Sequence, residues 1–249
     1  MVFKHGIWLE DVKEQKFLLS TSNKQYHPNK YHKICNDILS VTEETPKEAI
    51  DAVHVQIPEL METTNLTLNA IRFKTEMPNY GQLGGAYGDS FILLSNNITK
   101  NKLLKTQKID KDKIDEFIIE YNAELHFIEN STQQSNIKRK EELIYNIGWC
   151  EDKLQYDNFT YEGDNRNQII DHEFYHCLSY ARGGYTKHGL LFSQDMLCRT
   201  FCRDTKISFY GADSYIGEPS AEVYAYWKDG NKIPRKLEHN FRRIEDGKM

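Results

Sequence analysis

The segment His172-Glu173-Phe174-Tyr175-His176 has the residue types and the spacing of a zinc half-site. Residues four positions apart on an α-helix lie one turn apart on the same face, so both imidazoles are able to reach one metal ion. Glu173 is rotated about 100° around the helix axis from His172. From that position its carboxylate is able to reach a metal-bound water without displacing it. The His-Glu-x-x-His pattern is typical of metallopeptidase helices and predicts zinc-dependent hydrolysis.

The residues around this motif predict a helix from about 167 to 181. Asp164 and Asn165 are candidate caps at its start, and Gly183-Gly184 is a stop signal at its end. A helical wheel divides the helix into an apolar face and a polar, metal-facing one. The apolar face contains Ile170, Phe174, Cys177 and Ala181, and the polar face contains Ile169, His172, Glu173, His176 and Tyr180.

A catalytic zinc site needs a third protein ligand and an open position for water. Glu222 is the strongest candidate, because it lies within a second predicted helix. Pro219 suits the first position of that helix, and Asp229-Gly230 suits its end. The small residues Ala221 and Ala225 beside Glu222 allow the two helices to approach closely.

Other ligands are conceivable downstream of the motif. His188 lies in a turn rich in glycine and lysine, and Asp195 lies at the start of an apparent helix over 192–201. Arg182 occupies the position where the extended His-Glu-x-x-His-x-x-Gly-x-x-His motif needs its third histidine, which excludes the metzincin class.

The two motifs together resemble the catalytic lobe of the anthrax lethal factor family, which consists of gluzincin metallopeptidases. The resemblance covers residues 165–181, with His-Glu-Phe-x-His followed by Ser-Tyr, and residues 211–227, with Ala-Glu-x-Tyr-Ala. Two positions depart from the family. Tyr175 stands where glycine is usual, and Tyr226 replaces a second acidic residue.

This resemblance implies one zinc ion per chain, held by His172, His176 and Glu222. Glu173 would be the general base, taking a proton from the zinc-bound water as it attacks a peptide carbonyl. Tyr215 would supply the hydroxyl that steadies the tetrahedral intermediate. The expected substrate is a peptide or a protein.

The resemblance also implies an α+β, zincin-like fold. In that fold a small twisted sheet with an exposed edge strand packs on the active-site helix, alongside additional helices. Strands are predicted over 66–75 and 90–95, joined by a glycine-rich segment. Gly85, Ala86 and Tyr87 of this segment suit an exposed sheet edge, although an ordinary hairpin loop is the alternative. In zincins the substrate backbone pairs with such an edge, so these three residues are the candidate cleft wall.

The chain of 249 residues divides, by this interpretation, into a mainly helical region, 1–60, and a zincin-like metallopeptidase domain, 61–249. Thr45-Pro46-Lys47-Glu48 is a capping box that opens a helix in the first region. Apolar residues recur at helical spacing within about 110–155 and predict two long helices. We interpret them as an insertion that covers the cleft or binds a partner.

Composition restricts the remaining possibilities. The net charge is −5 without a basic face, which argues against a nucleic-acid role. No segment resembles a membrane span or the apolar core of a signal peptide. The five cysteines are scattered and odd in number, which indicates reduced thiols in a cytoplasmic setting. Cys198 and Cys202 lie one helical turn apart and are expected to be buried structural thiols.

Two other classes of function stay open. The first is a catalytically inactive, zincin-like structural or assembly protein of phage or mobile-element type, in which zinc is structural or lost. The second is an inhibitor or adaptor that acts through the inserted helices. The presence of Glu173 favours an enzyme, because a purely structural zinc site has no use for a base and usually closes with a fourth protein ligand.

Overall fold

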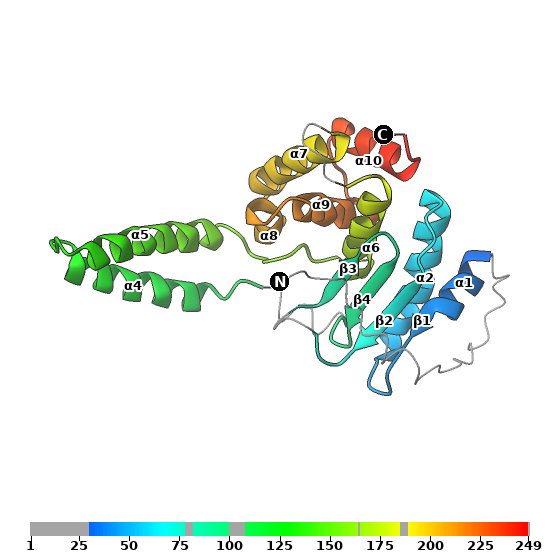
Figure 1. The fold of residues 1–249 in the computed structure, drawn as a ribbon, viewed down its shortest axis with the longest axis horizontal. Coiled ribbons are helices and arrows are strands. Elements are labelled where there is room, and N and C mark those ends of the chain that lie inside the picture. The colour runs from blue at the N-terminus through cyan, green and yellow to red at the C-terminus, as the bar shows by residue number, and fades with distance from the viewer. Residues whose placement is uncertain (1–29, 78–81, 100–107, 164, 185–188, 249) are drawn as a thin grey trace.

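The computed structural model describes residues 30–77, 82–99, 108–163, 165–184 and 189–248. These segments combine α-helices with one small β-sheet, so the predicted α+β class is confirmed. Figure 1 shows a body that contains the sheet and most of the helices, together with a two-helix arm that projects from it.

The sheet contains four strands in the order β1-β2-β4-β3. β1, β2 and β4 run parallel to one another, whereas β3 pairs with β4 in the antiparallel direction and forms one edge. Residues 84–87 of the glycine-rich segment therefore form an edge strand rather than a plain loop. The strand bounds are β1 Leu39–Ser40, β2 Ala70–Lys74, β3 Gly84–Tyr87 and β4 Phe91–Ser95.

Helices make up most of the remaining described structure. None of those within the described segments is both long enough and apolar enough to cross a membrane. Their bounds are α1 Lys30–Ile38, α2 Lys47–Thr64, α4 Lys111–Ile128, α5 Gln134–Leu154, α6 Gln168–Ala181, α7 Leu190–Thr205, α8 Phe209–Asp213, α9 Glu218–Lys228 and α10 Arg235–Glu245.

One hydrophobic core connects the sheet with α1, α2 and the helices of the C-terminal half. α6 packs against β3 and β4, and α2 packs against α6. β1 pairs with β2, so residues on both sides of position 60 belong to one sheet. The expected boundary between 1–60 and 61–249 consequently falls inside α2, and the two parts share this core. The strands contribute the fully buried side chains of Ile71, Phe73, Ile92 and Leu94.

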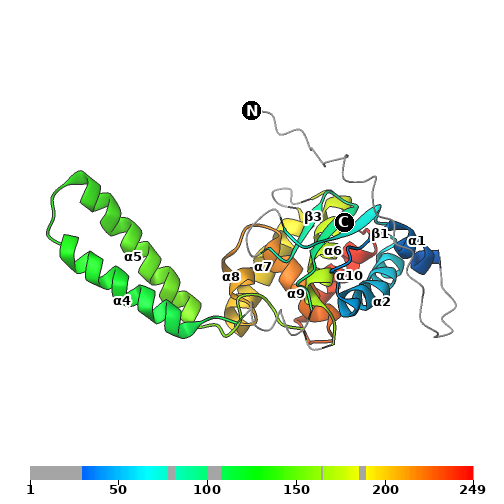
Figure 2. The same ribbon diagram turned by 90° about the horizontal axis from the view of Figure 1, so that it is seen from below.

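α4 and α5 form an antiparallel helical hairpin, which we call the arm (Figures 1 and 2). The side chain of Asp110 accepts a hydrogen bond from Lys113 N and caps the start of α4. Arg139 of α5 donates two hydrogen bonds to the Glu124 carboxylate of α4, a bidentate contact that links the two helices. The two helices predicted within about 110–155 are therefore present, and they project from the body as the arm.

Gly84 allows β3 to lie directly on the side chain of Glu173. A Cβ atom at this position would lie 2.6 Å from both Cγ and Oε1 of Glu173 and 2.8 Å from Cγ2 of Ile169. Side chains do not tolerate such distances without displacement. A residue with no Cβ is therefore required where the edge strand crosses α6.

We expect Gly84→Ala to lower the free energy of unfolding by about 1–3 kcal/mol, because overpacking forces β3 away from α6. Gly85→Ala is the matched control. Its Cβ would approach the Nε2 atom of Gln82 at 2.8 Å, the far end of a flexible side chain. Thermal unfolding of both variants tests this prediction, and equal melting temperatures would contradict it.

Candidate metal centre

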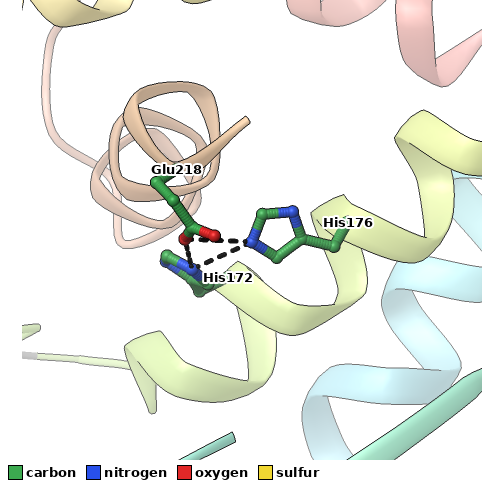
Figure 3. A group of neighbouring side chains, drawn as sticks. All are labelled: His172, His176 and Glu218. Atoms are coloured by element: carbon green, nitrogen blue, oxygen red, sulfur yellow. Dashed lines mark hydrogen bonds and ion pairs between the residues drawn. The ribbon is translucent and has the colours of Figure 1, made fainter. Parts of the chain in front are cut away.

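Two histidines of α6 and one glutamate of α9 direct their side chains to a common point between the helices (Figure 3). His172 Nε2 lies 2.9 Å from Glu218 Oε2 and 3.1 Å from His176 Nε2. His176 Nε2 lies 3.2 Å from the same Glu218 oxygen. Atoms that bind zinc tetrahedrally at about 2.0–2.1 Å are separated by about 3.3 Å. The spacing of the three donor atoms, and the His/His/Glu donor set itself, therefore fit a zinc ion.

The start of α6 fixes the direction in which the histidines point. The side chain of Asn167 accepts a hydrogen bond from Ile169 N and caps the helix. Of the two expected caps, Asn165 instead bonds to the C-terminal end of α9, and Asp164 lies outside the described residues. The helix ends as predicted at Gly183-Gly184, where both glycines have a positive φ.

Tyr175 does not crowd the metal centre, although it replaces the glycine usual in the lethal factor family. Its ring packs against Tyr224 of α9 at a centroid distance of 4.9 Å and against Phe241 of α10 at 5.6 Å. The Tyr175 side chain is fully buried. This large residue therefore fills the core between α6, α9 and α10.

Glu218 is held in place because the start of α9 is capped from another helix. Gly217 has a φ of 105°, a value that favours glycine, and Pro219 follows in the first turn. The buried carboxylate of Asp195, from α7, accepts hydrogen bonds from Gly217 N, Ser220 N and Ser220 Oγ. Asp195, an alternative ligand by sequence, thus caps the helix that presents Glu218. The helix N-terminus also favours the negative charge of Glu218.

The predicted ligand Glu222 lies one turn further along α9 and contacts the opposite nitrogen of His172. Its Oε1 atom is 3.0 Å from His172 Nδ1, and its Oε2 atom accepts a hydrogen bond of 2.6 Å from Tyr161 N. A carboxylate at the second nitrogen of a metal-binding histidine orients the ring and raises its basicity. The structure therefore places Glu222 at the Nδ1 side of His172, whereas Glu218 meets the Nε2 atoms of His172 and His176.

The sequence does not single out Glu218, although it contains a signal for it. Glu218 and Glu222 are four residues apart and share one face of α9. That pattern reveals a pair of carboxylates aimed at α6 without showing which of them faces the metal. His188, the other alternative ligand, lies outside the described part of the chain.

The charged side chains of this cluster shift one another's pKa values. Burial alone would lower the pKa of His172, but the adjoining carboxylates of Glu218 and Glu222 outweigh it and raise that pKa well above its ordinary value. Burial alone would raise the pKa of Glu218, but hydrogen bonds and charges from His172 and His176 hold it far below its usual range. A divalent cation is able to replace the proton that this arrangement favours on His172.

Glu173 lies beside the cluster, beneath β3. Its side chain is buried and forms no hydrogen bond or ion pair with any other described residue. Burial raises the pKa of Glu173, and the charges of His172 and His176 oppose this rise. A buried carboxylate with a raised pKa and no fixed partner is suited to accepting a proton near neutral pH.

Tyr210 of α8, rather than the predicted Tyr215, lies next to the histidines. Its ring lies roughly parallel to the ring of His172, with 6.4 Å between the centroids. Burial raises the pKa of Tyr210, and the negative charges of Glu218 and Glu222 add to the rise. The side chain of Tyr215, on the connection between α8 and α9, is 88% exposed.

The candidate cleft-wall residues Gly85, Ala86 and Tyr87 belong to the edge strand that adjoins α6. Among the described strands β3 pairs only with β4, so its other side has no strand partner there, although Gly84 O accepts a 2.7 Å hydrogen bond from the Gln82 side chain. Gly84 of the same strand lies against the side chain of Glu173, the candidate base. The edge strand is therefore next to that residue.

Comparison of the chain with protein-family models, characterised proteins and solved structures gave no match. The donor set, the buried acid and the open strand edge are thus the basis for assigning a function.

We expect elemental analysis to find about one zinc ion per chain in protein purified without a metal-affinity tag. Glu218→Ala removes a donor atom and should abolish zinc retention on dialysis. Glu222→Ala keeps all three donor atoms, so it should retain zinc with an affinity lowered by about 10–100-fold in chelator competition. The opposite ranking of the two variants would show that Glu222 is the ligand.

Proposed function

We propose that this protein is a zinc-dependent endopeptidase of the gluzincin type with a zincin-like fold, as its resemblance to the lethal factor family implies. One observation carries the proposal: Glu173, which is buried and has no ion pair with another described residue, lies beside a His/His/Glu donor set and against the edge strand β3. A structural metal site has no use for such a residue and usually has four protein ligands. Among the described residues, the metal-binding group comprises three.

Each side chain of the candidate centre has a separate role in the proposed reaction. His172, His176 and Glu218 would hold the zinc, and Glu222 would keep the His172 ring in its orientation. When bound, zinc supplies Lewis acidity and lowers the pKa of a coordinated water towards neutrality. Glu173 would accept a proton on a carboxylate oxygen as water attacks the peptide carbonyl, and would deliver it to the leaving amine.

Tyr210 takes the role that the sequence suggested for Tyr215. Its ring lies beside the ring of His172, and its raised pKa keeps the phenol protonated. A protonated phenol is able to donate a hydrogen bond to the oxygen that becomes negative in the tetrahedral intermediate.

The proposed substrate is an extended segment of a peptide or protein. Such a segment would pair with the outer side of β3, where main-chain hydrogen bonds supply affinity without requiring a particular sequence. Gly84 leaves the strand without a side chain next to Glu173. We also propose a cytoplasmic setting, which the five free and buried cysteines support.

The Glu173→Gln variant tests the proposal directly. We expect it to bind zinc like the wild type but to hydrolyse peptides about 10²–10⁴-fold more slowly, because its amide cannot accept the proton. Mass spectrometry of a peptide mixture incubated with each protein measures the difference. Glu151→Gln, at an exposed position of α5, is the matched control. Cleavage that survives in Glu173→Gln would show that Glu173 is not the base, and zinc binding with no cleavage by the wild type would favour the structural or assembly function.

Tyrosine variants distinguish the two candidate hydroxyl groups. We expect Tyr210→Phe to lower kcat about 10²-fold with unchanged zinc content, because a donor to the developing oxyanion is lost. Tyr215→Phe should leave kcat unchanged, since the ring of Tyr215 is exposed. Steady-state kinetics on one peptide cleaved by the wild type decides between them, and a slow Tyr215→Phe variant would restore the original prediction.

A further inference from the structure

The arm carries half of the large apolar side chains that the described residues expose. Isolated exposed apolar residues are ordinary, but a group of them on one element marks an interaction surface. Six of the twelve belong to α4 or α5, namely Phe117, Ile119, Phe127, Ile137, Ile144 and Tyr145. Two of the six, Ile119 and Phe127, have a defined arrangement on α4.

Ile119, Ala123 and Phe127 follow one another at intervals of four residues, so they lie along one face of α4. Ile119 is 69% exposed and Phe127 is 90% exposed. The buried residues of the helix, Ile114 and Ile128, lie on its opposite side. We call the exposed side the outer face of α4. No part of the described chain covers it.

The N-terminal half of the outer face is acidic. Asp112, Glu116 and Glu120 lie on it by helical spacing, and all three are exposed. None of them forms an ion pair with another described residue, whereas Glu124, at the side of α4 next to α5, pairs with Arg139.

Among the described residues, the neighbouring lysines form no ion pair with these carboxylates. Lys111 pairs with Asp157 at 2.8 Å, and Lys113 lies over the ring of Phe117 at 5.9 Å from its centroid. The outer face therefore combines an acidic half with an apolar half, in a fixed order along one helix.

We propose that the outer face of α4 is a docking site for a basic amphipathic helix of a partner protein. Apolar side chains of the partner would pack on Ile119 and Phe127, and its lysines or arginines would pair with the acidic half. A parallel contact with a second copy would bring like charges together, and an antiparallel contact would bury the acidic half of each helix against the apolar half of the other, so both are disfavoured. The negative charge likewise disfavours nucleic acids and anionic lipid surfaces.

The root of the arm lies beside the metal centre, so a docked partner would be joined to the element that reaches the site. Trp149 Nε1 of α5 donates a 2.8 Å hydrogen bond to Asp213 of α8, and Tyr210 N donates a 2.7 Å bond to Phe159 O just after the arm. The docking inference itself does not depend on peptidase activity.

Fluorescence anisotropy with a synthetic helical peptide of 18 residues, the length of α4, tests the proposal. The peptide carries leucines along one face and lysines along the rest, and a glutamate-for-lysine version is its control. We expect the full chain to bind the lysine peptide with a Kd of about 1–100 μM and the glutamate peptide at least tenfold more weakly. Binding should weaken as salt rises from about 50 to 300 mM.

Surface variants assign the binding to the outer face. Ile119→Ser with Phe127→Ser, and separately Glu116→Lys with Glu120→Lys, should each weaken binding about tenfold or more. Ile144→Ser with Tyr145→Ser, which changes exposed apolar residues of α5, is the matched control and should have no effect. Circular dichroism verifies that each variant is folded.

Three results would overturn the proposal. They are equal binding of both peptides, unchanged affinity in the outer-face variants, and self-association of the wild type that the Ile119→Ser, Phe127→Ser variant abolishes. The last result, measured by sedimentation, would make a second copy of the chain the occupant.

Discussion

The charge balance between α6 and α9 is the constraint on which the candidate site depends. Burying imidazoles and carboxylates between two helices costs free energy unless each group meets a complementary one. His172 meets Glu218 through Nε2 and Glu222 through Nδ1, so both of its nitrogens face a carboxylate. The same contacts that make the interface tolerable also assemble three donor atoms within reach of one ion. The side chains that offset the cost of burial are therefore the same ones that form the candidate metal site.

This balance of charges requires α9 to begin at Glu218. Groups from other parts of the sequence fix that starting point. Asp195 of α7 fixes the first turn of α9 through the main-chain N–H groups of Gly217 and Ser220. The main chain at Tyr161 fixes Glu222 from the other side. A shift of α9 by one residue would rotate both glutamates about 100° away from α6. Precision at the centre thus comes from capping and main-chain contacts rather than from the ligands alone.

Elements whose residues repeat with a local period could be predicted from the sequence. Contacts that depend on how distant segments of the chain come together could not. The helix around His172 and His176 follows from its 3.6-residue period and its glycine stop. For residues 84–87 the sequence suited an edge strand and a hairpin loop equally, and the pairing with β4 decides between them. The proposed choice of Glu218 over Glu222 as a metal ligand depends on how α9 is rotated about its axis. The proposed choice of Tyr210 depends on α8, whose five residues carry little periodic signal. β1 consists of two residues and owes its place to a parallel partner far along the chain.

The arm appears as an insertion in the sequence, yet its return segment is part of the candidate site. After α5 the chain passes α8, where Asn158 O and Phe159 O accept hydrogen bonds from Phe209 N and Tyr210 N. It then reaches Glu222 through Tyr161 N. The positions of both the candidate phenol and the carboxylate behind His172 are therefore set by the segment that follows the arm. A partner docked on the arm, as proposed, would therefore act on the chain next to these contacts, which connect the proposed docking face of α4 with the candidate site.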